Sequence, residues 1–411
     1  MSRAVSRGAR TRMTGRAILR AGIAALALAV VACGGGDDDD GVVTVPGPTP
    51  SATPTPAPTP TATPSPTATT TAVTRTPVAT FDNPWAMAFL PDGRLLVTER
   101  PGRLRLVTIN GQVSAAIAGV PAVAYGGQGG LFDVALDPAF ATNARIYLSY
   151  AEASSGGPAL AVARGTLAND GAGSVRLDNV SVIWRATPRS TDTRHFGARM
   201  AFARDGTLFV TSGERHQGAP AQDLSGTLGK IIRINTDGTI PADNPFVGTA
   251  GVRSEIWSYG HRNPYGLVFA SDGRLFESEM GPEGGDEFNL IAAGGNYGWR
   301  LVSEGNDGEV LPRHSTRPDL VAPLFSWTPV IAPGGMIQYR GSRFANWNDD
   351  FLLAGLVSQG LVRVRVSGTT ATEVARIPLH ARIREVEQGP ADTLWVLEDG
   401  GTGRLVRLDP A

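Results

Sequence analysis

The segment 260–299 concentrates residue types that bind anions and hard cations. It contains Arg262 beside Asn263 and the acidic pair Asp286 and Glu287, separated by glycine-rich turns. Arginine presents a rigid fork of donors that matches a carboxylate, whereas carboxylate and backbone carbonyl oxygens are the ligands that calcium prefers. A fold does not require this combination. The segment therefore predicts a site that holds an anionic cofactor beside a hard cation.

Two further clusters contain side chains suited to catalysis or binding. The glycine loop 125–131 presents one amide side chain, that of Gln128. His195 lies between Arg194 and Arg199 and beside a glycine turn, and histidine is the natural general base near neutral pH. Glycines in β proteins mostly form turns, and a single histidine is more often packed or on the surface. These residues alone therefore leave a catalytic role open.

Carbonyl oxygens and paired arginines complete the candidate site. Pro282 has no backbone N–H, which leaves the carbonyls of Gly281 and Pro282 free to face a ligand. Near the C-terminus, Arg382 and Arg384 alternate along a strand, so both guanidinium groups lie on one face and suit a polycarboxylate. The alternatives are an ordinary solvated acidic loop and an ordinary polar strand face.

The elements that must position these residues are short strands. Residues 79–411 contain many short apolar runs bounded by Gly, Asp, Asn and Pro, and no long segment with helical periodicity. An Asp-Gly turn before a short strand recurs at Asp92, Asp205 and Asp272, with a degenerate copy at 391–396, and the spacings are one or two units of about 60 residues. This repeat predicts an all-β, six-bladed β-propeller, in which loops at one face converge on the central channel. A pair of β-sandwiches would not explain the recurrent turn.

Residues 1–33 have the pattern of a lipoprotein-type signal peptide. Six arginines precede an apolar run at 21–32 that is too short to span a bilayer. The run ends at Cys33, the only cysteine of the chain, in a pattern that resembles a bacterial lipobox. Cys33 would then carry a lipid anchor, and Gly34 after it predicts the periplasmic face of the outer membrane. The alternative is an ordinary secretory signal with an incidental cysteine.

The composition separates a linker from a folded domain. Residues 34–78 are expected to form a disordered linker, because glycine and aspartate are followed by a tract dominated by Pro, Thr, Ser and Ala. The remainder, 79–411, is long enough to bury a substantial core. The chain has 37 Lys and Arg residues against 38 Asp and Glu residues. This balance argues against a nucleic-acid partner.

In this order, the clusters and the segments around them resemble the soluble, calcium-dependent pyrroloquinoline quinone (PQQ) aldose dehydrogenases of the glucose/sorbosone dehydrogenase type. The resemblance covers about 83–408. It rests on the segments NPWAMAFLPDGRLLVTER, QGGLFDVALDPAF, HFGAR, GKIIRIN, DNPF, EIWSYGHRNP, GPEGGDEFN and GGNYGW. No single segment is decisive, whereas the ordered set is specific. The resemblance implies a six-bladed propeller that oxidises aldose sugars with PQQ and calcium.

The resemblance also implies a role for each candidate residue. His195 matches the base that takes the proton of the anomeric hydroxyl, while hydride passes to the quinone and a lactone forms. Arg262 lies near the quinone carbonyl that develops negative charge. The other implied roles are contact with the quinone by Gln128 and Asn263, calcium ligation by the carbonyls of Gly281 and Pro282, a second, structural calcium at Glu287 and Tyr297, and binding of the cofactor carboxylates by Arg382 and Arg384. The implied electron acceptor is a periplasmic quinone or cytochrome.

The chain departs from the family pattern at several positions. A lysine of the family's cofactor pocket aligns with Val357, and the loss of one charged hydrogen bond weakens binding by about 1–3 kcal/mol. Arg363 and Arg365 are the nearest cations in the sequence that could compensate. The other departures surround the substrate pocket and leave the sugar preference open: Arg194, Ala198 and Tyr265.

The sequence leaves two other functions to weigh. A non-catalytic extracytoplasmic binding propeller that no longer binds PQQ would explain Val357, but not the retention of His195 and the arginines. A calcium-dependent lactone hydrolase would need a carboxylate-ligated metal at the channel centre. The acidic residues of this chain are instead expected to cluster on one loop.

Overall fold

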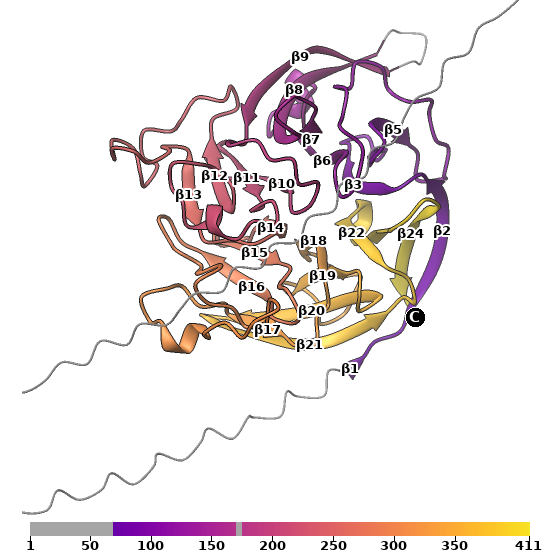
Figure 1. Cartoon of the computed structure of the whole chain (residues 1–411). Helices are drawn as coiled ribbons and strands as arrows, with labels where there is room; N and C mark the ends of the chain where they lie inside the picture. Colours follow the sequence, from indigo (N-terminus) through magenta and orange to yellow (C-terminus); the bar gives the residue numbers. More distant parts are fainter. Residues whose placement is uncertain (1–68, 170–174) are drawn as a thin grey trace, which may run out of the picture. The chain divides into compact units, whose positions relative to one another are not determined.

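The computed structural model describes residues 69–169 and 175–411 of the 411-residue chain. The expected signal peptide and most of the expected linker lie outside the described residues. Six β-sheets form most of the regular structure of the described part (Figure 1). Helical turns there are limited to α1 (Phe140–Asn143), η1 (Ala219–Ala221), η2 (His314–Thr316) and η3 (Pro390–Asp392). The prediction of an all-β, six-bladed propeller is confirmed.

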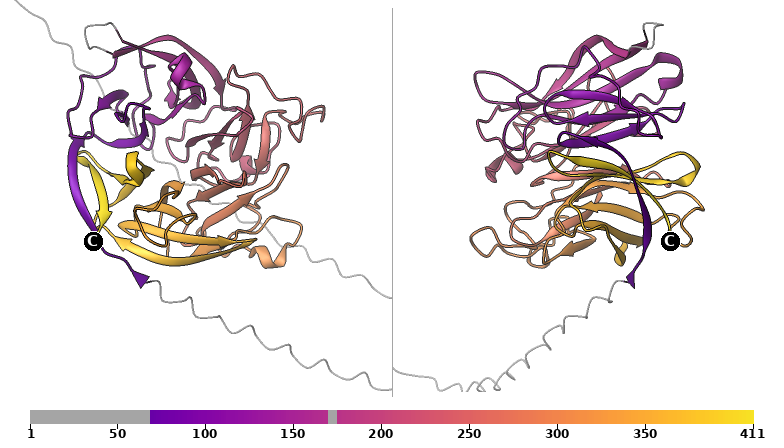
Figure 2. Two further views of the ribbon diagram at one scale, coloured as in Figure 1. Left: turned by 180° about the vertical axis from the view of Figure 1, so that it is seen from behind. Right: turned by 90° about the vertical axis from the view of Figure 1, so that its right-hand side faces the viewer.

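Each sheet is one blade, and its strands follow one another outward from the centre of the ring (Figures 1 and 2). The first three blades are β3 (Pro84–Phe89), β4 (Leu95–Glu99) and β5 (Arg103–Val107); β6 (Leu131–Leu136), β7 (Arg145–Glu152), β8 (Ala159–Asn169) and β9 (Val175–Arg185); and β10 (Gly197–Phe202), β11 (Leu208–Ser212), β12 (Lys230–Ile234) and β13 (Ile256–Tyr259). The other three are β14 (Pro264–Phe269), β15 (Leu275–Glu279), β16 (Asp286–Ile291) and β17 (Phe325–Trp327); β18 (Pro333–Gln338), β19 (Phe351–Gly355), β20 (Gly360–Ser367) and β21 (Thr370–Pro378); and β22 (Ile383–Gln388), β23 (Leu394–Glu398), β24 (Gly403–Pro410) and β2 (Val73–Phe81). The short strand β1 (Thr69–Thr70) pairs in parallel with β21.

The recurrent Asp-Gly turn occupies the same place in each blade that contains it. It joins the innermost strand to the second strand in the blades that begin with β3, β10 and β14. Gly93, Gly206 and Gly273 have φ values of 86°, 84° and 90°, which a residue without Cβ adopts at no steric cost. In the blade of β22 the degenerate copy makes the same connection. The repeat in the sequence is therefore the repeat of the blade.

Strand β2 closes the ring and moves the expected domain boundary. It pairs antiparallel with β24, from Val73 opposite Pro410 to Phe81 opposite Gly403. Residues 73–78, assigned from composition to the linker, therefore belong to the last blade. Their Thr and Pro content had suggested a linker. Proline is tolerated at position 77 because β2 is the outermost strand of its sheet and Pro77 lies beside a register shift, so the absence of its backbone N–H breaks no hydrogen bond to a further strand.

The inner strands line the central channel. The six of them contact one another in sequence around a closed ring, β3, β6, β10, β14, β18, β22 and β3 again. In most of them the first four residues are buried and the last two are partly open. All six inner strands run in the same direction along the channel axis. The segments that precede them therefore meet at one face. No helix in the described ranges is long and apolar enough to cross a membrane.

Candidate active site

The structure brings most of the predicted site residues to the face where the inner strands begin. Gln128 precedes β6, His195 precedes β10, and Arg262 and Asn263 precede β14. Gly281 and Pro282 follow β15, which is antiparallel to β14 and so ends at the same face. Arg382 and Arg384 lie at the start of β22. Residues separated by more than 250 positions are thus neighbours because six strand starts converge there.

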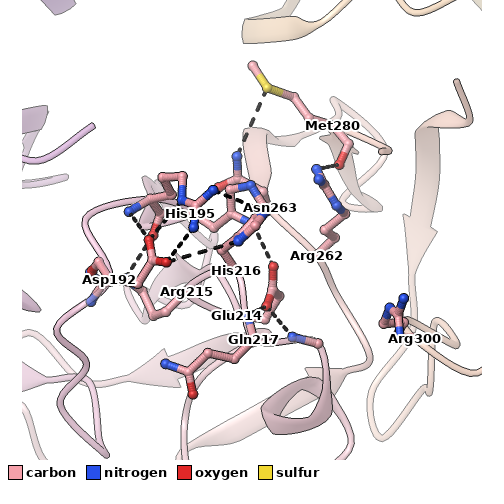
Figure 3. Close-up of polar contacts among 12 residues, drawn as sticks. Asp192, His195, Glu214, Arg215, His216, Gln217, Arg262, Asn263, Met280 and Arg300 are labelled. Atoms are coloured by element: carbon pink, nitrogen blue, oxygen red, sulfur yellow. Dashed lines mark hydrogen bonds and ion pairs between the residues drawn. The ribbon is translucent and has the colours of Figure 1, made fainter. Parts of the chain in front are cut away.

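His195 is bound by a carboxylate that the sequence did not single out. Its Nδ1 lies 2.5 Å from Oε1 of Glu214 (Figure 3). The other oxygen of Glu214 accepts hydrogen bonds from the backbone N–H groups of Gln217 and Gly218, the latter at 2.5 Å. The His195 and Glu214 side chains are both buried. The imidazole ring is therefore fixed in orientation by a partner that is itself held by backbone donors.

The pKa values of both residues are lowered, which favours a neutral His195 beside an ionised Glu214. Burial lowers the pKa of His195 below its ordinary value, against the hydrogen bond that His195 donates to Glu214, which raises it. Burial raises the pKa of Glu214, but its hydrogen bonds with His195 and the backbone outweigh this effect, and the net pKa is lower than usual. An ionised Glu214 accepts a hydrogen bond from Nδ1–H of His195, which places the single imidazole proton on Nδ1. Nε2 of His195 is then an acceptor, as a general base requires.

Two amide side chains position the loop that carries His195. Oε1 of Gln128 accepts the backbone N–H of His195 at 2.7 Å, and Oδ1 of Asn263 accepts the N–H of Gly197 at 3.3 Å. His195 itself has a φ of 48°, an uncommon conformation for a residue with a Cβ. Gln128 and Asn263, implied as cofactor contacts, thus also stabilise the backbone of the base. The NH2 group of Asn263 donates to Sδ of Met280 at 4.0 Å (Figure 3).

A buried arginine, Arg215, contacts the same loop through its guanidinium group. The guanidinium of Arg215 lies 3.7 Å from the centre of the Phe196 ring. It donates to the carbonyls of Arg194 and Pro158 at 2.9 and 2.8 Å, and to that of Asp192. Arg194, a departure from the family pattern, points outward and pairs with the carboxylate of Asp192.

Arg262 lies between the base and the glycine-rich loop after β15. One terminal nitrogen donates to the carbonyls of Met280 and Gly281 at 2.9 and 2.8 Å. Its guanidinium lies 5.3 Å from the centre of the Trp299 ring, and its Nε is buried without a partner. An unpaired buried donor is costly. Arg262 therefore retains hydrogen-bonding capacity toward a ligand.

A cavity of about 160 Å³ lies beside these residues. It is lined by Trp85, Arg100, Gln128, Tyr265, Met280, Ala332, Leu356, Arg382 and Arg384. Arg382 and Arg384 both pair with the carboxylate of Asp399, at 3.0 and 2.9 Å, which places their guanidinium groups on one side of the strand. Three cations and two aromatic rings line one space, a set suited to a flat polycarboxylate.

Arg100 supplies the third cation of the cavity and was not identified from the sequence. It donates to the carbonyl of Gly129 at 3.0 Å, and its Nε is buried without a partner. Val357, at the family's lysine position, lies half-exposed in the turn after β19. Arg363 and Arg365 do not replace the lysine, because both pair with Asp350, at 2.9 and 2.7 Å.

A second cavity, of about 170 Å³, adjoins Glu214, the partner of His195. It is lined by Glu214, His216, Gln217, Gly218, Arg262, Trp299, Arg300 and Asp307. The ring of His216 lies 4.9 Å from that of His195, edge to face. A hydroxyl-rich molecule is bound by hydrogen-bond donors and acceptors together with an aromatic ring. This cavity has those components next to the base.

The glycine-rich loop after β15 is shaped by Asp286. Its oxygens accept the N–H groups of Gly281 at 2.9 Å, of Ile331 at 2.7 Å and of Ala332 at 2.6 Å. A Cβ on Gly281 would lie 2.3 Å from the carbonyl oxygen of Gly284, so only glycine fits there. The Gly281 carbonyl accepts Arg262, which shows that it is directed toward positive charge.

Glu287 and Tyr297 border a cavity of about 10 Å³, the size of one water or ion. Burial and the charge of Glu279 raise the pKa of Glu287 to about 8. The Tyr297 hydroxyl is engaged by Leu290 and Ala292, at 2.6 and 2.8 Å. Only its backbone carbonyl, which lies 3.0 Å from Nε2 of His314, is suited to a metal.

The other end of the channel also contains acidic residues, which the sequence did not predict. A cavity of about 440 Å³ there is lined by residues that include Asp133, Glu385 and Glu387. Arg199 pairs with Glu385 and lies 3.4 Å from Asp133. The expectation that acidic residues gather on one loop is corrected. Because Arg199 already pairs with two of the carboxylates, this end differs from the carboxylate-ligated metal centre of a lactone hydrolase.

Comparison with known proteins gives one consistent family. The family model described as "Glucose / Sorbosone dehydrogenase" matches residues 81–407. The aldose sugar dehydrogenase YliI of Escherichia coli is 39% identical over 338 residues, covering 80% of this chain and 90% of that protein. The quinoprotein glucose dehydrogenase B of Acinetobacter calcoaceticus is 32% identical over 264 residues, covering 55% of this chain and 52% of its own length.

Solved structures agree with the sequence relatives. The soluble aldose sugar dehydrogenase from Escherichia coli in its apo-form has a TM-score of 0.78 and 37% identity, covering 82% of this chain and 100% of that chain. The PQQ-bound form of the aldose sugar dehydrogenase from Streptomyces coelicolor has a TM-score of 0.67 and 28% identity, covering 82% and 98%.

Proposed function

The chain belongs to the glucose/sorbosone dehydrogenase family of sugar oxidoreductases, and on that premise we propose that it oxidises the anomeric hydroxyl of aldoses to lactones with PQQ and calcium. One observation carries the proposal. The neutral base His195, held at 2.5 Å by the buried Glu214, belongs to the same face as a cavity lined by three guanidinium groups. A binding propeller that had lost its cofactor would need neither.

The residues of the cavity fit the cofactor. PQQ is a flat, aromatic tricarboxylate, and the cavity offers Arg100, Arg382 and Arg384 for carboxylates. Trp85 and Tyr265 supply ring surface. The carbonyls of Gly281 and Pro282 are suited to the calcium beside it, and Glu287 with the Tyr297 carbonyl to a second, structural calcium.

The chain's own residues account for the proton and for charge stabilisation. Nε2 of His195 accepts the proton of the anomeric hydroxyl, and Glu214 stabilises the imidazolium that forms. Arg262 provides a fixed cation next to the reacting groups, where it stabilises developing negative charge. When bound, the quinone supplies the two-electron acceptor for the hydride, a step that belongs to the cofactor. The 170 Å³ cavity next to Glu214 and His216 gives the sugar a polar place beside the base.

The test is a cofactor titration. The protein is stripped with chelator and titrated with PQQ, with and without calcium, while dye reduction is followed on a panel of aldoses. Turnover that requires both PQQ and calcium supports the proposal. PQQ binding without turnover would place the error in the sugar or the acceptor, whereas no PQQ binding at any calcium concentration would refute it.

Arg100 is expected to take the place of the missing family lysine. In Arg100→Met the Kd for PQQ should rise about 10–100-fold, because one charged hydrogen bond is lost. Arg94→Met is the matched control, since Arg94 is an exposed arginine paired with Asp92. Fluorescence titration with PQQ measures both. An unchanged Kd in Arg100→Met would show that the cofactor does not use this cation.

Glu214→Gln tests the partner of the base through the pH profile. The hydrogen bond that His195 donates to Glu214 raises the pKa of His195, so its loss should move the acidic limb of kcat to lower pH. At the same time kcat should fall by roughly 10–1000-fold, because the imidazolium loses its counter-charge. Initial rates from pH 5 to 9 separate the two effects. A lower kcat with an unmoved limb would indicate a purely structural role for Glu214.

The location and electron acceptor complete the proposal. The family relationship supports an extracytoplasmic protein, and the lipobox-like pattern at Cys33 supports a lipid anchor facing the periplasm, with a quinone or cytochrome there as acceptor. Cys33→Ser should abolish fatty-acid labelling and move the protein from the membrane fraction to the soluble fraction. Labelling that persists in Cys33→Ser would exclude this anchor.

A further inference from the structure

A group of buried acidic residues lies on one face of the blade built by β14 to β17. Strand register places Glu279 opposite Glu287 and Glu277 opposite Asn289. Residues two apart in a strand, and residues opposite in register, share a face. All four side chains are buried, and Glu277 and Asn289 are fully inaccessible. Three carboxylates and one amide therefore gather in the interior.

A histidine faces this group from the segment that connects β13 to β14. His261 is fully buried, and its ring stacks on that of Tyr297 at 4.7 Å. Its Nδ1 lies 3.3 Å from Oε1 of Glu279, and its Nε2 lies 2.9 Å from Oγ of Ser258. One ligand atom each of His261, Glu277 and Glu279 lies within 4.8 Å of the other two. The three side chains converge as ligands of one ion would.

Two oxygen atoms in the group have no hydrogen-bond partner. They are Oε1 of Glu277 and Oδ1 of Asn289. Nδ2 of Asn289 donates to Glu277 at 3.0 Å and to Glu287 at 3.3 Å. A buried acceptor without a donor costs free energy, and each such group requires an explanation. Both orphans are acceptors, which points to a cation rather than an anion.

The charges of the group also require compensation. Glu277 is fully buried, and its hydrogen-bond donor within the group is the uncharged amide of Asn289. Buried carboxylates are stable when they are protonated, paired or bound to a metal.

We propose that His261, Glu277 and Glu279, with the amide oxygen of Asn289, form a divalent-cation site between two blades. Because the Nε2 proton of His261 can be donated to Ser258, the Nδ1 lone pair is available to the ion. An imidazole nitrogen together with carboxylate oxygens favours Zn²⁺ or Mn²⁺ over Mg²⁺ or Ca²⁺. The four ligands differ from the carbonyls of Gly281 and Pro282 and from the Glu287–Tyr297 pair, although Glu279 also lines the small cavity beside Glu287 and Tyr297. The proposal makes no use of PQQ or of a sugar.

The ion would stiffen the segment that presents Arg262 and Asn263. One oxygen of Glu279 faces the proposed ion, while the other accepts the backbone N–H groups of Arg262 at 2.5 Å and Asn263 at 3.1 Å. A cation that fixes Glu279 therefore also fixes the backbone of these two residues. The site is a structural element beneath the cofactor face.

Metal content measured without PQQ tests the proposal. The full chain is stripped with chelator, dialysed against Zn²⁺, Mn²⁺ or Ca²⁺ singly, and analysed by mass spectrometry for metal and by calorimetry for Tm. Glu277→Gln removes one charge while keeping the shape and the bond to Asn289. Glu373→Gln, in which a carboxylate paired with Arg376 is changed, is the control.

Wild type is expected to bind about one equivalent of Zn²⁺ or Mn²⁺ more than Glu277→Gln, and to show a metal-dependent rise in Tm that this variant lacks. Glu373→Gln should behave as wild type. Equal metal content in wild type and Glu277→Gln, or a wild type that binds neither metal, would overturn the proposal. In that case, a Glu277→Gln protein more stable than wild type would identify protonation as the means of neutralisation.

Discussion

His195→Asn is expected to reduce kcat for aldose oxidation by about 10²–10⁴-fold at neutral pH, which is the usual contribution of a positioned general base. Asparagine tolerates the φ of 48° at this position and can still be reached by Glu214, but it has no basic nitrogen. The Kd for PQQ should remain close to that of wild type, because His195 does not line the cofactor cavity. Stopped-flow reduction of the bound cofactor by sugar measures the loss directly.

The matched control is His380→Asn. His380 is exposed, has a φ of 51°, and lies at the end of the chain's fifth blade rather than in either cavity. Its replacement by asparagine should leave kcat, KM and the Kd for PQQ unchanged. A His195→Asn protein that retains more than about a tenth of wild-type kcat would show that another group accepts the proton. Loss of PQQ binding in the same protein would instead indicate that the loop 193–197 had moved.

Turn chemistry is the reason that the fold could be predicted from the sequence. The Asp-Gly turns at Asp92, Asp205 and Asp272 are local signals, because glycine accepts positive φ irrespective of the surrounding structure. Their spacing gave the number of blades. The linker boundary could not be read in the same way. Residues 73–78 are strand only because β24 provides a partner more than 300 positions away.

The candidate site was predictable only where a residue type implies its chemistry. A histidine beside glycine turns or two alternating arginines can be recognised locally, and the structure places His195, Arg382 and Arg384 at one face. Glu214 and Arg100 have no such signal, since their roles depend on which strand starts lie side by side. Register in β15 and β16 likewise brings the buried glutamates together. Gln128 and Asn263 were identified from the sequence as site residues. Their hydrogen bonds to the backbone around His195 became visible only in the three-dimensional structure.

Arg262→Met is expected to lower kcat by about 10²–10³-fold, as the loss of one preorganised donor to developing charge does. The effect should be mainly on kcat, because the interaction gains strength as negative charge forms. Arg317→Met, which removes an exposed arginine paired with Asp319, is the control and should keep full activity. Single-turnover rates at saturating PQQ and sugar measure the change.

A second role of Arg262 makes calcium the decisive variable in this experiment. Its guanidinium binds the carbonyls of Met280 and Gly281, so its removal also frees an oxygen implied as a calcium ligand. If Arg262 acts on the reacting charge, kcat of Arg262→Met stays low at every calcium concentration. If it serves only to hold the loop, saturating calcium should take over that function and restore kcat. Arg262→Lys keeps the positive charge but loses the forked pair of donors. If Arg262 acts on the reacting charge, kcat of Arg262→Lys should lie between those of wild type and Arg262→Met; if Arg262 only holds the loop, it should not.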